Sequence, residues 1–199
     1  MSTLRPGDSR ILTADDSLLL IIDAQDHFFR KLDRQTAEDV AQRIAWVGAL
    51  AAWLGIPIIA TAEELDRHGG IAAPIARELP ATVPTFDKPA FGLAANPAIF
   101  EAVAAAGRHT AVLVGLETDV CILQSAFGLL DAGYRVAAVQ DAVAAPGPAH
   151  QAGLARMCAL GVELLTVKGL YYEWTRTVAR ASGFLDDRPD LGAPHGTVL

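Results

Sequence analysis

Three side chains of complementary chemistry follow strand-like segments of the sequence within a few residues. Asp23 directly follows the apolar run 18–22, and Cys121 follows the apolar run 110–115 after a short polar turn. Lys88 lies between them in the chain, behind a third strand-like segment. A carboxylate can take the proton of a thiol and later pass it to a leaving amine, and a nearby ammonium group stabilises both anions. These residue types therefore form a candidate set for covalent catalysis with Cys121 as the nucleophile.

Cys121 lies at the beginning of a helix-like run, residues 120–132. A free thiol has a pKa of about 8.5 and is mostly neutral at pH 7, whereas the backbone amides at a helix N-terminus favour the thiolate. We therefore expect the pKa of Cys121 to be lowered, with Asp119 capping the helix. Cys158, the other cysteine, lies in an apolar helical run and is expected to belong to the core.

Each member of the set also has a purely structural explanation when it is taken alone. An Asp after a strand is often a turn or cap residue, and a Lys is usually a solvated surface charge. A Cys in a helix is often a small buried apolar residue. Joint placement at the ends of three strands favours the catalytic interpretation, because a parallel sheet gathers the residues that follow its strands.

The elements that must position these residues alternate between short apolar runs and longer amphipathic ones. Strands are predicted at residues 18–22, 57–61, 85–86, 110–115, 135–139 and 162–166. Helices are predicted at residues 36–54, 73–78, 97–106, 120–132, 149–160 and 170–181, with Asn96 capping the third. This alternation predicts an α/β fold with a six-stranded parallel sheet covered by helices on both faces.

The 199 residues are 52% hydrophobic and 20% charged, which suits one domain spanning residues 1–199. The domain core is expected at about residues 15–180, and the Pro- and Gly-rich tail 184–199 is expected either to be flexible or to pack against another subunit. A net charge of −7 argues against nucleic acid or an anionic membrane as the main partner.

The sequence offers no sign of export or membrane insertion. Residues 1–10 contain no apolar stretch of the kind found in secretory signals. The apolar runs are about five residues long, far below the roughly 20 needed to span a bilayer. Two cysteines in a chain of this length do not form a disulfide framework. We therefore expect a cytoplasmic protein.

Three segments together resemble the isochorismatase-like cysteine hydrolases, a family that includes nicotinamidases and N-carbamoylsarcosine amidases. They are LLLIIDAQDHF (18–28), FDKPAFG (86–92) and GLETDVCILQSAFGLLDAGYRVAAVQDA (115–142). The resemblance implies a three-layer α/β/α sandwich with a Rossmann-like sheet and a catalytic triad of Asp23, Lys88 and Cys121. It also implies a cis peptide bond at Leu116–Glu117, with the backbone N–H groups of Glu117 and Cys121 directed at an oxyanion.

The activity implied by the resemblance is cysteine-dependent hydrolysis of a carbon–nitrogen bond, in an amide or carbamoyl group, through a thioester. No cofactor is expected, the partner is a small-molecule substrate, and members of the family usually assemble as homo-oligomers. Isochorismatases proper split a vinyl ether and lack this cysteine, so Cys121 argues against that reaction. Phe28, Phe91 and Trp174 are candidates to line the substrate pocket.

Nicotinamidases of the family bind a divalent metal through an Asp-x-His element and a later His. Asp66 and His68 have that spacing here, but the usual following proline and second histidine are missing. No metal site is therefore predicted.

Two other classes of function remain open at this stage. A catalytically silent family member could act as a binding or structural oligomer, although the intact triad argues against it. A dinucleotide-binding module is disfavoured, because no Gly-x-Gly-x-x-Gly follows the first strand and carboxylates stand where phosphates would bind.

Overall fold

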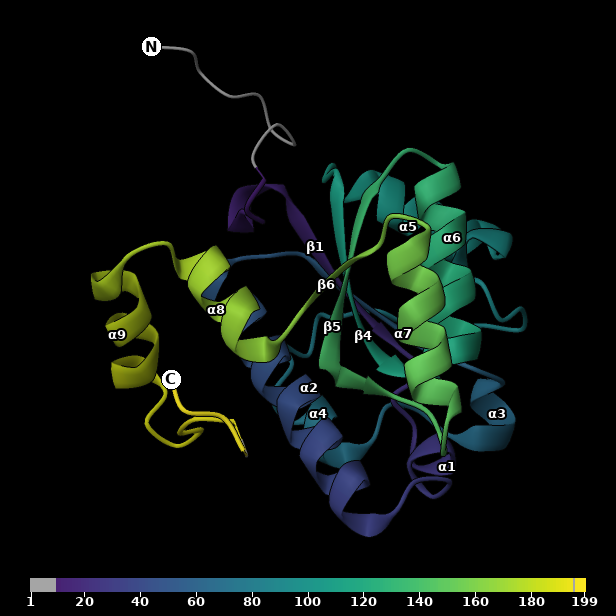
Figure 1. The fold of residues 1–199 in the computed structure, drawn as a ribbon, viewed down its shortest axis with the longest axis horizontal. Coiled ribbons are helices and arrows are strands. Elements are labelled where there is room, and N and C mark those ends of the chain that lie inside the picture. Colours follow the sequence, from purple (N-terminus) through teal and green to yellow (C-terminus); the bar gives the residue numbers. More distant parts are fainter. Residues whose placement is uncertain (1–9, 195) are drawn as a thin grey trace.

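The computed structural model describes residues 10–194 and 196–199 and contains one six-stranded parallel sheet (Figure 1). Its strand order is β3-β2-β1-β4-β5-β6. The strands are β1 (Ser17–Ile22), β2 (Ile58–Ala62), β3 (Thr85–Asp87), β4 (Thr110–Leu116), β5 (Arg135–Ala144) and β6 (Glu163–Leu165). The predicted sheet is confirmed, and β5 alone runs well past its predicted end, from residue 139 to Ala144.

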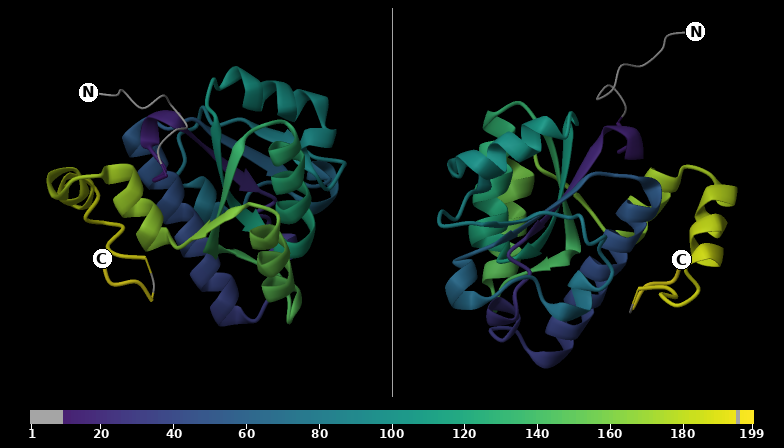
Figure 2. Two further views of the ribbon diagram at one scale, coloured as in Figure 1. Left: turned by 45° about the horizontal axis from the view of Figure 1, so that its top comes forward. Right: turned by 180° about the vertical axis from the view of Figure 1, so that it is seen from behind.

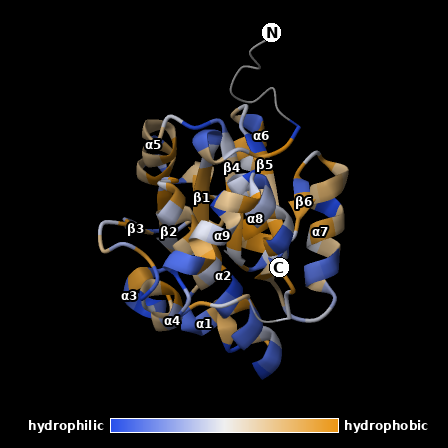
Figure 3. Cartoon of the chain, turned by 90° about the vertical axis from the view of Figure 1, so that its left-hand side faces the viewer, coloured by the Kyte–Doolittle hydropathy of each residue, from blue (hydrophilic) through white to orange (hydrophobic). Residues whose placement is uncertain are grey.

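Helices cover both faces of the sheet and produce the predicted three layers (Figure 2). On one face, α2 (Arg34–Leu54) and α8 (Val167–Thr175) pack against strand residues such as Leu19 and Ile21. On the other face, α5 (Pro97–Ala105), α6 (Leu123–Asp131) and α7 (Ala149–Ala159) pack against the alternate residues of the same strands. Because both faces are covered, the central strands β1 and β4 are apolar after their first residues, Ser17 and Thr110, as Figure 3 shows by their orange colour.

Three short helices, α1 (Asp26–Phe29), α3 (Leu65–His68) and α4 (Ala73–Ala76), lie in the loops that follow β1 and β2. Only α4 was predicted from the sequence. The predicted last helix, 170–181, is wrong: α8 ends at Thr175, and α9 (Val178–Asp187) begins after a break. The break lies at Arg176, whose φ is 65°, and the side chain of Thr177 caps α9 by accepting a hydrogen bond from the Arg180 amide.

The C-terminal tail packs against the domain's own helices. The Trp46 indole of α2 donates to the carbonyl oxygen of Gly192 at 2.9 Å, and Arg188 forms an ion pair with Glu78 at 2.7 Å. The tail is therefore in contact with helices of its own chain. Within the described residues, no helix is both long and apolar enough to cross a bilayer. The expectation about residues 1–10 lies outside the described part, apart from Arg10.

The expectation that Cys158 is a core residue is wrong. Its side chain is exposed on α7, whereas its neighbour Met157 is fully buried against the sheet. Cys158 is one residue beyond Met157, so it points about 100° away from the buried face of the helix. A run of apolar residues in the sequence does not show which of them face the core.

Gly115 permits the close approach of β4 to β1 just before the turn that carries Cys121. Its φ is 126°, and a Cβ built there would lie 1.9 Å from the carbonyl oxygen of Ile22. We predict that Gly115→Ala lowers the free energy of unfolding by about 3 kcal/mol or more, since both the backbone and the neighbouring strand must shift.

The matched control is Gly133→Ala, at a φ of 87° with no atom within 4 Å of the added methyl group. We expect it to cost only about 1–2 kcal/mol of backbone strain. Urea denaturation of both variants tests this, and equal costs would contradict the packing argument.

Candidate functional site

The carboxyl ends of β1, β2, β3 and β4 meet at one edge of the sheet and deliver the chemically active side chains there. Asp23 follows β1, Lys88 follows β3, and Cys121 lies in the turn after β4. The structure brings these three predicted residues together. The Asp23 carboxylate and the Cys121 sulfur belong to one group whose ligand atoms lie within 4.8 Å of one another.

Asp23 and Lys88 form an ion pair with no solvent exposure on either side chain. Lys88 Nζ lies 2.9 Å from Asp23 Oδ2, and the Thr61 hydroxyl donates to Asp23 Oδ1 at 2.8 Å. Lys88 Nζ also donates to the carbonyl oxygens of Ala90 at 3.0 Å and Phe91 at 2.9 Å. The ammonium group thus donates two hydrogen bonds to backbone carbonyls and has its charge paired with Asp23, as a buried lysine requires.

The loop that supplies these carbonyls is organised by Asn96. Its side-chain amide donates to the carbonyl oxygen of Gly92 at 2.9 Å and accepts from the amide of Ala90 at 3.3 Å. Asn96 was predicted to cap α5, but its side chain forms no capping hydrogen bond. It instead shapes the loop around the Lys88 ammonium.

The backbone at Asp23 is held in an uncommon conformation, with a φ of 48°. Its amide donates to the carbonyl oxygen of Thr61 at 3.0 Å, which joins the residue to β2. Burial raises the pKa of the Asp23 carboxyl even though Lys88 and Thr61 act in the opposite direction. A carboxylate with a raised pKa is a stronger base, which suits proton transfer from a thiol.

Cys121 lies in a single π-helical turn, Thr118–Ile122, that precedes α6, and its side chain is 2% exposed. The peptide bond between Leu116 and Glu117 is cis. The expected cap by Asp119 is not formed: Asp119 lies inside the turn, and the residue at the cap of α6 is Ile122.

Contacts from α7 and from the loop before α2 hold this turn. The Thr118 hydroxyl lies 2.9 Å from His150 Nδ1, and Lys31 forms an ion pair with Glu117 at 3.2 Å. Gly153 allows α7 to approach closely, since a Cβ there would lie 2.9 Å from the Asp119 Cα. The turn that carries Cys121 is therefore well packed.

The pKa of the Cys121 thiol is strongly raised, which is the opposite of the expectation from the sequence. Burial is the largest cause, and the negative charges of Asp23 and Glu63 add to it, while Lys88 acts in the opposite direction. The substrate-free protein therefore holds a neutral thiol at pH 7, and the sulfur becomes a nucleophile only when its proton is transferred.

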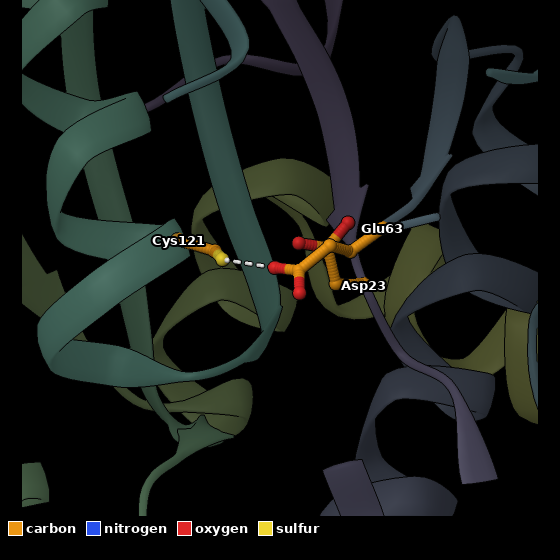
Figure 4. A group of neighbouring side chains, drawn as sticks. All are labelled: Asp23, Glu63 and Cys121. Carbon is orange, nitrogen blue, oxygen red and sulfur yellow. Dashed lines mark hydrogen bonds between the residues drawn. The ribbon is translucent and has the colours of Figure 1, made fainter. Parts of the chain in front are cut away.

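Glu63 is a functional candidate that the sequence analysis missed. The Cys121 thiol donates to Glu63 Oε2 at 3.4 Å, and Figure 4 shows Glu63 and Asp23 directed at the sulfur from the same side. Glu63 follows β2 directly, and the same position after a strand identified Asp23 and Lys88, so this signal could also have identified Glu63.

The three predicted pocket residues have different surroundings. Phe91 is 52% exposed beside the Lys88 loop and stays a candidate for the pocket wall, whereas Phe28 is only 4% exposed and packs in the core. Trp174 does not line the site. Its indole donates to Ser17 Oγ at the beginning of β1, about 20 Å along the strand from Asp23.

Among the described residues, two groups could each offer three metal ligands. One is Asp23, Glu63 and Cys121, and the other is Glu63, Glu64 and His68. Asp66 does not belong to either group, so the Asp66–His68 pair does not form the metal-binding element of nicotinamidases. Glu63 is also engaged with the Cys121 thiol, and a single histidine is present. These residues do not fit that metal site, and the chemistry below uses the chain's own side chains.

Comparison with known proteins supports the fold and the family. Residues 17–169 match the Isochorismatase domain. Bovine isochorismatase domain-containing protein 2 is 30% identical over 176 residues, covering 87% of this chain and 81% of the relative.

Two solved structures share the fold. The Escherichia coli YcaC gene product, described as an octameric hydrolase of unknown specificity, has a TM-score of 0.80 at 21% identity, covering 92% of this chain and 93% of its own. A pyrazinamidase/nicotinamidase from Streptococcus mutans has a TM-score of 0.65 at 22% identity, and the match covers 75% of this chain and 99% of that structure's chain.

The buried ion pair predicts a strong energetic coupling between Asp23 and Lys88. Lys88→Met leaves a buried carboxylate without its cation and should cost about 3–5 kcal/mol of unfolding free energy. Asp23→Asn should also destabilise the fold, and the double variant should lose much less than the sum. Urea denaturation of the three variants gives the coupling, and additive costs would contradict a closed pair.

The raised thiol pKa predicts the pH dependence of alkylation at Cys121. The thiolate fraction grows about tenfold per pH unit below the pKa, so labelling by iodoacetamide should keep accelerating from pH 7 to pH 10 without levelling. Mass spectrometry can follow Cys121 and the exposed Cys158 on the same chain. A plateau at Cys121 below about pH 9 would show that its thiol pKa is not raised.

Proposed function

The chain belongs to the isochorismatase family of hydrolases, and from this premise and the site geometry we propose that it hydrolyses a carbon–nitrogen bond of a small amide or carbamoyl compound through Cys121. One observation carries the proposal: the Cys121 thiol lies beside the buried carboxylate of Asp23, which forms an ion pair with Lys88 at 2.9 Å and has a raised pKa. Such a carboxylate can exchange a proton with the thiol and the leaving nitrogen.

In the first half of the reaction, Asp23 accepts the Cys121 proton while the sulfur attacks the carbonyl carbon. The C–N bond then breaks, and Asp23 passes the proton to the departing amine, which leaves as ammonia. The acyl group remains on Cys121 as a thioester. Lys88 stays charged throughout and limits the cost of moving negative charge within a buried site.

In the second half, Asp23 takes a proton from water, and the hydroxide formed attacks the thioester. The C–S bond breaks, the carboxylic acid leaves, and the proton returns to Cys121. The balance is R–CO–NH2 plus water giving R–COO⁻ and ammonium. We assign stabilisation of the tetrahedral oxyanion to the backbone amides of Glu117 and Cys121, in the turn after Leu116.

We further propose that copies of this chain associate with one another and that it acts in the cytoplasm. Support for association is the octameric state described for the YcaC gene product and the exposed apolar side chains on the C-terminal helices, among them Tyr172 and Val178.

Ammonia release from a panel of small amides, carbamoyl compounds and ureido acids tests the proposed reaction. We predict release by the wild type from at least one compound and a loss of more than about 1,000-fold in Cys121→Ala. Cys158→Ala is the matched control and should retain wild-type rates, because its side chain is exposed on α7. Absence of release from every compound would favour a silent family member acting as a binding or structural oligomer.

A further inference from the structure

We propose that Glu63 selects the substrate: its carboxylate binds a positively charged nitrogen next to the scissile carbonyl, on the acyl side of the C–N bond. The substrate class is therefore a small primary amide with a protonated amine beside the carbonyl. This inference rests on the proposed hydrolysis of amides by Cys121.

The position of Glu63 gives it access to the acyl group of a bound amide. Glu63 Oε2 lies 3.4 Å from the Cys121 sulfur, and the attacked carbon must come within about 3–3.5 Å of that sulfur. The groups attached to that carbon therefore lie within reach of Glu63. Asp23 is held by Thr61 and Lys88 and is used on the leaving nitrogen, which leaves Glu63 for the acyl side.

Glu63 is also held firmly in place. Its backbone amide donates to Gln25 Oε1 at 2.8 Å, and its carbonyl accepts from Gln25 Nε2 at 3.0 Å. The same Gln25 nitrogen donates to the carbonyl oxygen of Gly69 at 2.6 Å, and Gln25 is fully buried. These bonds fix the Glu63 backbone, and the Cys121 thiol contacts the carboxylate itself, so less conformational entropy is lost when the carboxylate binds a partner.

The charges around the sulfur leave one carboxylate without a cation. Asp23 and Glu63 face the thiol, and Lys88 pairs with Asp23 alone. In the described part of the chain, no Lys, Arg or His forms an ion pair with Glu63.

Basic side chains on the flanking segments have carboxylates of their own. His68, whose ring nitrogen lies within 4.8 Å of the Glu63 carboxylate, pairs with Glu64 at 3.8 Å. Lys31 pairs with Glu117 at 3.2 Å, and Arg67 pairs with Glu64 at 2.8 Å. A cationic substrate would complete the charge balance at Glu63, whereas an anionic one would meet two carboxylates in a poorly solvated site.

The same arrangement links substrate binding to activation of the thiol. Glu63 is one of the groups that hold the Cys121 pKa high in the free protein. A cation bound to Glu63 offsets that charge, so ionisation of the sulfur becomes easier when the right substrate is present. A neutral amide of equal size lacks this effect.

Three amides of similar size test the selection by turnover. Glycinamide carries an ammonium group where propionamide carries a methyl group, and malonamate carries a carboxylate. At pH 7 we expect the wild type to release ammonia from glycinamide at least about tenfold faster, by kcat/KM, than from propionamide, with malonamate slowest. In Glu63→Gln, the rates on glycinamide and propionamide should lie within about threefold of each other. A wild-type rate on propionamide that equals or exceeds the rate on glycinamide overturns the proposal.

Charged thiol reagents test Glu63 without any turnover. We would measure the rates at which a trimethylammonium-ethyl and a sulfonatoethyl methanethiosulfonate modify Cys121. The ratio of the two rates cancels the thiolate fraction, because both reagents react with the same sulfur. In the wild type, we expect the ratio of the cationic to the anionic reagent's rate to be at least about tenfold higher at Cys121 than at Cys158. Glu63→Gln should abolish this preference for the cationic reagent.

The matched control is Glu64→Gln, which removes an adjacent carboxylate that already pairs with Arg67 and should leave the ratio at Cys121 unchanged. An unchanged ratio in Glu63→Gln, or a fall of equal size in both variants, overturns the role of Glu63. If the preference for the cationic reagent depends on Glu63 but no amide releases ammonia, then amide hydrolysis has failed and the charge selection stands.

Discussion

The site depends on one buried ion pair, between Asp23 and Lys88. Neither side chain is exposed, and the 2.9 Å contact is completed by Thr61 and by two loop carbonyls. Removing two charges from water is expensive, so the surrounding loops must supply every hydrogen bond that water would have given. That requirement fixes the ends of β1, β2 and β3 relative to one another. It also keeps a basic carboxylate beside the Cys121 sulfur.

A neutral Cys121 thiol is the second consequence of burial. Burial and the charge of Asp23 raise the pKa of the thiol, and in the proposed reaction the same Asp23 is the base that removes its proton. A thiol with a raised pKa stays protonated, which slows its oxidation and alkylation, and in the proposed reaction it ionises only as its proton passes to Asp23. Packing of α7 and the ion pair of Lys31 hold the turn at the position where this transfer can occur.

Much of the fold follows from the sequence because apolar runs report burial on two faces of a parallel sheet. Strand positions and the meeting of Asp23, Lys88 and Cys121 could be predicted in this way. The break at Arg176 and the exposure of Cys158 could not, because they depend on a single backbone dihedral and a single step around a helix. Glu63 follows β2 directly and could have been identified as a strand-end residue, but its contact with the Cys121 thiol and the direction of the thiol pKa shift could not. Both depend on distances between side chains from different strands, which no local pattern encodes.

The central claim is that Cys121 carries the acyl group as a thioester, and acyl transfer to hydroxylamine tests it most directly. Hydroxylamine intercepts a thioester and gives a hydroxamate, which is measured beside the ammonia released from the same amide. We predict that hydroxamate grows with hydroxylamine concentration at the expense of the free acid and that it disappears in Cys121→Ala. Cys121-dependent ammonia release with no hydroxamate at any hydroxylamine concentration would contradict the account.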